Sequence, residues 1–187
     1  MEIKDLLNNY SIIGVIGNYQ SALIKKGLVK DIKVKNIEKA LTMVNLDKSI
    51  INYKLEDLTI SEFWKVELIS KLENDIIIVG NISNSLIYKD IEYMKKLFIK
   101  LSTEYNKKIV VIDNNLKTFF NLTNKIVFMN NKKIQFDITN FYDKKLEKYI
   151  ELPPIIDFVK TVNKNKRILN ETIDIYELIK DIYRSVT

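Results

Sequence analysis

Residues 73–86 read ENDIIIVGNISNSL, and the apolar run inside this stretch decides the fold class. Ile76 to Val79 are four consecutive aliphatic residues between polar ones. This pattern is typical of a β-strand that is buried on both faces. Gly80 and Asn81 end the run, and a polar segment follows them. The stretch therefore predicts a buried strand with a loop at its carboxyl end.

Strands and helices alternate on both sides of this run. Apolar runs predict strands at residues 11–17, 108–112 and 125–129, and an Asn-Asn hairpin turn joins the last of these to a further predicted strand at 133–137. Apolar residues at helical spacing predict helices at residues 36–44, 59–72, 87–101 and 119–122. Thr59 and Glu62 form a capping box at the start of the second helix. Because strands alternate with helices, we expect an α/β domain with a mostly parallel sheet.

The C-terminal segment differs in character from the rest. Leu152-Pro153-Pro154 precedes a predicted helix at 155–162, since proline fits the first turn of a helix but not its interior. A polar break at 163–166 is followed by Asp174 to Glu177, which resembles a second capping box and predicts a final helix. The expected division is an α/β domain at 1–145 and a helical extension at 146–187. The extension is too small to be stable alone, so we expect it to pack on the main domain or on a partner.

The composition excludes several kinds of site. The chain has 187 residues, of which 47% are hydrophobic and 29% charged, a globular balance. It has no Cys and no His, which excludes disulfides, thiolate and imidazole metal ligands and Ser-His-Asp triads. No apolar run approaches the roughly 20 residues of a membrane span, and no signal peptide follows Met1, so we expect a cytoplasmic protein.

The charge pattern bears on partners. The net charge is +6, yet no run of basic residues exceeds three and no aromatic-plus-basic ribonucleoprotein signature occurs, so we expect no nucleic-acid partner. A mild positive charge also suits a protein that docks peripherally on the anionic inner face of the cell membrane.

Four motifs resemble those of the nucleotide-binding domain of ABC transporters, and they occur in the same order. They are IGVIG at 13–17, LTISE at 58–62, VVIDNNL at 110–116 and NKIVFM at 124–129. They look like the family's phosphate-loop strand, its Leu-Ser-Gly-Gly-Glu signature, its switch segment and its closing strand. Residues 76–81 stand where the family has apolar residues followed by Asp-Glu. The resemblance covers most of the chain and implies a P-loop NTPase-like core.

The C-terminal extension resembles one particular group within this family. Residues 149–155, YIELPPI, look like the C-terminal extension of energy-coupling-factor (ECF) vitamin and metal transporter ATPases. In that group, Leu-Pro-Pro opens a helical domain that helps two ATPases dimerise. The resemblance implies a protein partner, either an intact ABC or ECF-type ATPase or a second copy of this chain, contacted through Leu152, Pro153 and Pro154.

The phosphate loop departs from the family pattern. Gly17 keeps the first glycine, while Tyr19-Gln20 replaces a small, flexible pair. Aligned with the family, Ala22, Leu23 and Ile24 stand for the second glycine, the phosphate-binding lysine and the metal-binding Ser/Thr. Replacing the lysine with leucine removes a charge and adds apolar bulk where a phosphate would lie. The resemblance therefore implies a vestigial site that does not hold Mg·ATP.

The catalytic positions have changed as well. Aligned with the family, Gly80 replaces the carboxylate that supports Mg²⁺, Asn81 replaces the glutamate that polarises water, and Asn114 replaces the switch histidine. Asparagine can hydrogen-bond but cannot act as a base near neutral pH. We therefore expect a non-catalytic pseudo-ATPase with no cofactor, no metal and no catalytic residues.

Two further expectations concern the first half of the chain. Only 34 residues lie between Leu23 and Leu58, fewer than the family uses for its antiparallel β-subdomain, glutamine loop and helical arm. We expect a truncated core that lacks most of these parts. Phe63 and Trp64 stand where the family has polar residues. We expect one of them in the core and the other at a partner interface, because aromatic residues anchor interfaces.

Other interpretations stay open. A divergent ATP-binding subunit of an ECF transporter would need a lysine from elsewhere, such as Lys25 or Lys26. A basic module that binds nucleic acid or a membrane surface would use the net charge of +6. Residues 11–17 also read as an ordinary core strand with a tight turn, and residues 113–115 as a turn at the end of a strand.

Overall fold

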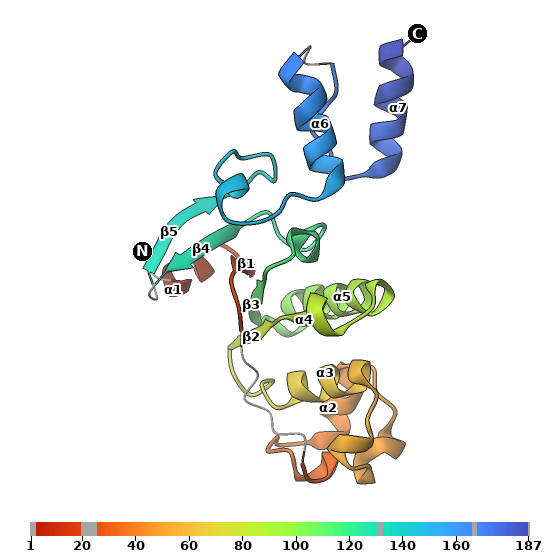
Figure 1. Ribbon diagram of the computed structural model, residues 1–187. Helices are drawn as coiled ribbons and strands as arrows, with labels where there is room; N and C mark the ends of the chain where they lie inside the picture. Colours follow the sequence, from red (N-terminus) through yellow and green to blue (C-terminus); the bar gives the residue numbers. More distant parts are fainter. Residues whose placement is uncertain (1–2, 20–25, 131–132, 166–167, 187) are drawn as a thin grey trace.

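A five-stranded sheet forms the centre of the molecule, with most helices on one side of it (Figure 1). The structure is a computed structural model, and it describes residues 3–19, 26–130, 133–165 and 168–186. The strands are β1 (Ile12–Ile16), β2 (Ile76–Gly80), β3 (Lys108–Asp113), β4 (Ile126–Asn130) and β5 (Lys133–Ile138). The α-helices are α1 (Ile3–Leu7), α2 (Ile37–Met43), α3 (Ile60–Ile69), α4 (Ile82–Ser85), α5 (Tyr88–Tyr105), α6 (Pro154–Asn165) and α7 (Ile175–Val186).

The strand order is β2-β3-β1-β4-β5. Strand β1 runs parallel to both β3 and β4, β2 runs parallel to β3, and β5 is antiparallel to β4. The predicted α/β class with a mostly parallel sheet is therefore confirmed. Because β1, β2 and β3 are parallel, the loops that follow them meet at one edge of the sheet.

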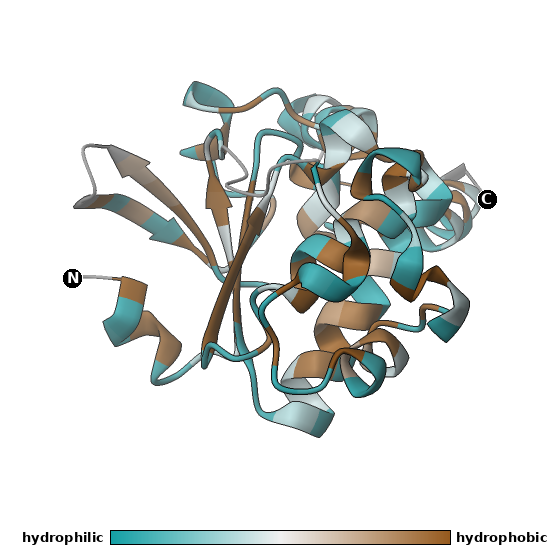
Figure 2. Ribbon diagram, turned by 90° about the horizontal axis from the view of Figure 1, so that it is seen from below, coloured by the Kyte–Doolittle hydropathy of each residue, from teal (hydrophilic) through white to brown (hydrophobic). Residues whose placement is uncertain are grey.

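Two apolar layers cover the two faces of the sheet. Residues of α3 and α5 pack in the apolar cluster on one face, and residues of α1 pack in the cluster on the other. Figure 2 shows the short helix next to the N-terminus on one side of the sheet and the larger group of helices on the other. On the α1 face, Leu6 and Leu7 pack over Ile13 and Val15 of β1. The prediction that the strand at 76–79 is buried on both faces is wrong at Ile78, which is 41% exposed. The reason is that β2 is the edge strand, so the short helix α1 does not cover it.

Residues 26–59 fold into short helical elements and not into a sheet. Besides α2 they form the 3₁₀ helices η1 (Val29–Asp31), η2 (Lys48–Asn52) and η3 (Leu55–Asp57). The only strand-like pairing in this described stretch is a single antiparallel bridge between Leu28 and Lys54. These elements pack with α3 beyond the β2 edge of the sheet (Figure 1).

Some local predictions are confirmed and others need correction. The capping box is present, since Glu62 N–H donates to Thr59 Oγ1 (3.3 Å) and Thr59 N–H donates to the Glu62 carboxylate (2.9 Å). The short helix predicted at 119–122 is instead the 3₁₀ helix η4 (Leu116–Phe119). Helix α6 also continues to Asn165, through the first part of the predicted polar break.

The C-terminal helices α6 and α7 lie side by side at one end of the molecule (Figure 1). Ile156 and Val159 of α6 are fully buried and belong to the same apolar cluster as the sheet. A 3₁₀ helix, η5 (Leu146–Lys148), lies in the chain before α6. The extension thus contacts the main domain, which is one of the two arrangements that the sequence left open. None of the helices in the described residues combines the length and apolarity that a membrane span requires.

Candidate active site at the carboxyl edge of the sheet

The candidate site lies where β1, β2 and β3 end. In open α/β sheets, ligands bind outside the carboxyl ends of the strands, near the point where the strand order reverses. Strand β1 occupies that point here, between β3 and β4. The loops that meet there carry Gly17 to Tyr19, Gly80 and Asn81, and Asp113 and Asn114. The structure thus brings together the predicted site residues that stand at the ends of these three strands. Ala22, Leu23 and Ile24, together with Lys25, lie outside the described residues.

Tyr19 packs directly on Gly80. A Cβ atom placed on Gly80 would lie 2.3 Å from Tyr19 Cβ and 2.7 Å from the carbonyl oxygen of Ile112. Both distances are far below ordinary van der Waals contact, which begins near 3.5 Å. The strand ends in glycine because this close approach leaves no room for any side chain.

Asn81 holds the backbone of Tyr19 from two sides. Tyr19 N–H donates to Asn81 Oδ1 (3.3 Å), and the Asn81 amide Nδ2 donates to the carbonyl oxygen of Tyr19. An ionised carboxylate only accepts, so Asp or Glu at position 81 could make the first bond but not the second. Asn81 also has a positive φ of 55°, a conformation that asparagine adopts more readily than most residues.

Lys71 anchors the ring end of Tyr19. Its ammonium nitrogen lies 3.2 Å from Tyr19 Oη, 2.6 Å from Glu67 Oε1 and 2.8 Å from the carbonyl oxygen of Ile78 at the free edge of β2. The Glu67 side chain is buried, with 1% of its surface exposed. Tyr19 is thus bonded through its backbone to Asn81 and through its hydroxyl to Lys71, and the loop after β1 is closed onto the end of β2.

Asp113 ties the β2 and β3 ends together. It is fully buried and accepts three hydrogen bonds, from Ser83 Oγ (2.5 Å), Ser83 N–H (3.1 Å) and Asn115 N–H (2.9 Å). Its backbone carbonyl also accepts from Gly17 N–H (3.3 Å). These hydrogen bonds give the Asp113 carboxylate a structural role. In the part of the chain that the structure describes, no group of three acidic residues could hold a metal ion.

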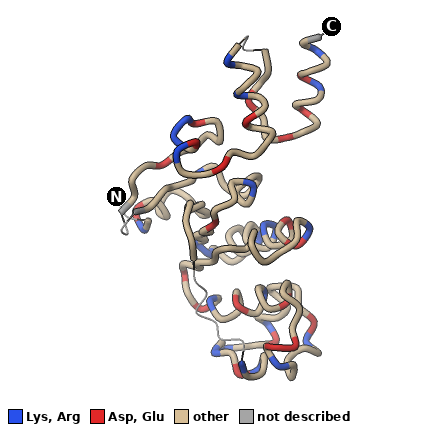
Figure 3. Tube along the Cα trace, in the orientation of Figure 1, with Lys and Arg blue, Asp and Glu red and all other residues tan. Residues whose placement is uncertain are grey.

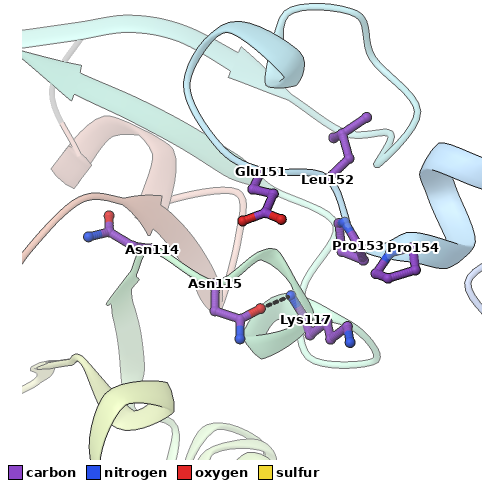
Figure 4. Close-up of a pocket in the computed structure, with 7 residues that line it drawn as sticks. All are labelled: Asn114, Asn115, Lys117, Glu151, Leu152, Pro153 and Pro154. Carbon is purple, nitrogen blue, oxygen red and sulfur yellow. Dashed lines mark hydrogen bonds between the residues drawn. The ribbon is translucent and has the colours of Figure 1, made fainter.

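A polar cavity of about 300 Å³ adjoins this edge (Figure 4). Asn114, Asn115 and Lys117 line one side, and Glu151 with Leu152-Pro153-Pro154 lines the other. The structure therefore brings Asn114 and the Leu-Pro-Pro segment to one place, although the sequence analysis assigned them to different roles. The Asn114 amide donates to Asn18 Oδ1 (2.5 Å), in the loop after β1.

Phe63 and Trp64 lie elsewhere, in the first turns of α3. Each has 7% of its surface exposed, so both side chains are buried. The expectation that one of them faces a partner is not met in this structure. Trp64 belongs to the same apolar cluster as residues of the sheet and of α2, and both side chains are among the buried hydrophobic residues.

Neither a protein-family model nor a curated protein sequence matches the chain. Solved structures do match it. A dimeric ATP-binding cassette in a post-hydrolysis state, bound to ADP and Pi, aligns over 74% of this chain and 68% of its own, with 16% identity and a TM-score of 0.52. CbiO1 from Clostridium perfringens, part of the ABC transporter complex CbiONQ, aligns over 83% of this chain and 64% of its own, with 14% identity and a TM-score of 0.53.

The chain has the ABC-cassette fold. Sequence reasoning located the strand ends of this ABC-cassette fold correctly, but it missed the closing contacts made by Tyr19 and Lys71. The sequence did contain a signal for these contacts, because a bulky Tyr19 follows β1 while a glycine, which leaves room for it, ends β2.

Proposed function

We propose that this chain is a non-catalytic protein related to ABC ATPases, a pseudo-ATPase that acts as a structural or regulatory partner of an ABC or ECF-type transporter ATPase. The observation that carries the proposal is the closure of the carboxyl edge. Tyr19 occupies the place where an α/β sheet of this type would receive a ligand, and Asn81 and Lys71 hold it over Gly80.

The remaining chemistry of this edge supports the same proposal. Hydrolysis needs a group that activates water and a cation that stabilises the developing charge. Asp113 already accepts three hydrogen bonds, and Asn81 is committed to the Tyr19 backbone as both donor and acceptor. These two side chains at the strand ends thus serve structure and are not placed to activate water.

The partner is proposed from the extension. CbiO1 is described as part of the CbiONQ complex, and the cassette bound to ADP and Pi is dimeric. Helices α6 and α7 expose large apolar side chains, among them Phe158 (46% exposed), Ile175 (53%) and Tyr176 (74%). Such a surface suits a protein interface. A cytoplasmic ATPase of this type, or a second copy of this chain, is the partner that the Leu-Pro-Pro extension fits.

The test combines ATP turnover with complex formation. The purified chain should show no Mg·ATP turnover, and it should co-elute with an intact ECF-type ATPase in size-exclusion chromatography or form a dimer by itself. Tyr176→Asp should disrupt whichever complex forms, while Tyr53→Asp, which changes a 51% exposed tyrosine outside the extension, should leave it intact. Turnover that Lys26→Ala abolishes would instead support the divergent ATPase. The absence of any complex would refute the partner role.

A further inference from the structure

The groove between α3 and α5 has the features of a docking site, and nothing in the proposed function uses it. It encloses about 480 Å³ and is lined by Ser61 and Lys65 of α3 and by the first turns of α5. Lys65 and Tyr93 meet across it, with the Lys65 ammonium nitrogen 4.3 Å from the centre of the Tyr93 ring. We call this feature the α3–α5 groove.

Large exposed apolar side chains include one that lines the groove and two next to lining residues in the chain. Tyr88, the first residue of α5, lines the groove and is 75% exposed, and the preceding N-cap residue Ile87 is 68% exposed. Ile60, the first residue of α3, is 55% exposed and precedes the lining residue Ser61. Single exposed apolar residues are ordinary, whereas adjacent ones beside a groove indicate an interaction site.

The groove has more basic than acidic lining residues, three lysines against two acids. Lys65, Lys89 and Lys96 line it, and within the described residues neither Lys89 nor Lys96 has an ion-pair partner. Two acids, Asp90 and Glu92, also line it, but the Glu92 carboxylate is paired with Lys95 at 2.6 Å. Figure 3 shows that basic and acidic residues are interspersed along the whole chain, so this excess is local.

The start of α5 adds to the positive potential. Its N-cap residue is Ile87, whose side chain cannot accept a hydrogen bond from the first turn. No side chain caps the first N–H groups of α5 beside Lys89, and Asp90 in the first turn offsets only part of the positive end of the helix dipole. A carboxylate from another molecule would find both the uncapped N–H groups and the lysines there.

We propose that the α3–α5 groove binds an acidic protein segment that carries large apolar side chains. The exposed Ile60, Ile87 and Tyr88 would contact the apolar side chains, and Lys89 and Lys96 would pair with the carboxylates. Charge complementarity selects an acidic segment over a basic one, and the apolar mouth selects a protein over a purely ionic ligand.

The test uses the full chain and fluorescence anisotropy with three labelled probes. The first is a synthetic peptide of Glu residues with Leu and Trp anchors, the second is the same peptide with Lys for every Glu, and the third is a single-stranded oligonucleotide. The acidic peptide should bind and the other two should not, and its affinity should fall as salt is raised.

Two variants place the site. Lys89→Glu combined with Lys96→Glu should weaken binding of the acidic peptide about tenfold or more. The charge-matched control, Lys33→Glu combined with Lys148→Glu, changes two exposed lysines outside the groove and should leave the affinity unchanged. Ile87→Asp should weaken binding yet raise the melting temperature, because it caps α5 from within the chain.

Three results would overturn the proposal: equal affinity in the groove and control variants, tighter binding of the basic peptide, or binding of the oligonucleotide in preference to the acidic peptide. A rise in melting temperature for Ile87→Asp without a change in affinity would also contradict it. That result would show that the capped helix end lies outside the binding surface.

Discussion

Adding one methyl group at Gly80 tests the closed edge of the sheet. In Gly80→Ala, the new Cβ would lie 2.3 Å from Tyr19 Cβ and 2.7 Å from the backbone oxygen of Ile112. The loop carrying Tyr19 must move by about 1 Å to restore ordinary contact, and the Ile112 carbonyl belongs to a neighbouring strand that cannot easily follow. Overpacking of this kind costs about 1–3 kcal/mol of unfolding free energy.

The assay is thermal and urea unfolding of Gly80→Ala beside Gly17→Ala. A Cβ at Gly17 would meet only Ile112 Cγ2 at 3.8 Å, so that variant should be neutral or slightly stabilising. For a chain of this size each kcal/mol shifts the melting temperature by about 2–4 °C, so the two variants should separate clearly. In a Tyr19→Gly background, part of the cost of Gly80→Ala should disappear, as a double-mutant cycle measures. Equal melting temperatures for the two alanine variants, or a cost independent of Tyr19, would refute the packing of Tyr19 on Gly80.

Three further predictions follow from the described contacts. Lys71→Met leaves the buried Glu67 carboxylate without its partner and should lower the free energy of unfolding by about 3–5 kcal/mol in a urea titration. Lys48→Ala breaks an exposed ion pair with Glu38 and should change stability little in the same titration, so similar losses for the two variants would contradict the assignment. Thr59→Ala removes the capping box and should lower the free energy of unfolding by about 1 kcal/mol in thermal unfolding. The control Thr103→Ala removes an exposed hydroxyl late in α5 and should change stability little. An unchanged stability of Thr59→Ala would show that the cap is not needed. Burial raises the pKa of Tyr142, so the folded chain keeps the phenol proton at pH values where the unfolded chain, with a tyrosine pKa of about 10, has lost it. The free energy of unfolding should therefore fall as pH rises above about 10, and Tyr142→Phe should lose less stability over that range. Equal pH profiles for the two proteins would contradict this prediction.

The sequence predicted the strands well because β1 to β4 are largely apolar runs and β5 alternates polar and apolar residues after a hairpin turn. Both patterns can be recognised from neighbouring residues alone. The capping box at Thr59 was predictable for the same reason, since its two partners lie three residues apart. The 3₁₀ helices η1 to η3 were not predicted. Each buries a single apolar residue, Val29, Ile50 or Leu55. One buried residue gives no repeating hydrophobic pattern from which a helix could be predicted.

What the sequence could not show depends on strand order and on distant contacts. The exposure of Ile78 follows from the edge position of β2, which no local pattern reveals. The closure of the site joins Tyr19 to Asn81 and to Lys71, pairs separated by 62 and 52 residues along the chain. The sequence therefore indicated that Gly80 and Asn81 differ from the family pattern, while the structure supplies the physical reason for both residues.

Nucleotide affinity is the most direct measure of the central claim, that Tyr19 fills the place of a ligand at the carboxyl edge. Isothermal titration of the full chain with Mg·ATP, run beside an intact ECF-type ATPase as a positive control, should give no binding heat for this chain at millimolar nucleotide. Sub-millimolar binding that depends on Mg²⁺ would contradict the claim, because the proposal leaves no place for a triphosphate while Tyr19 packs on Gly80 and is bonded to Asn81.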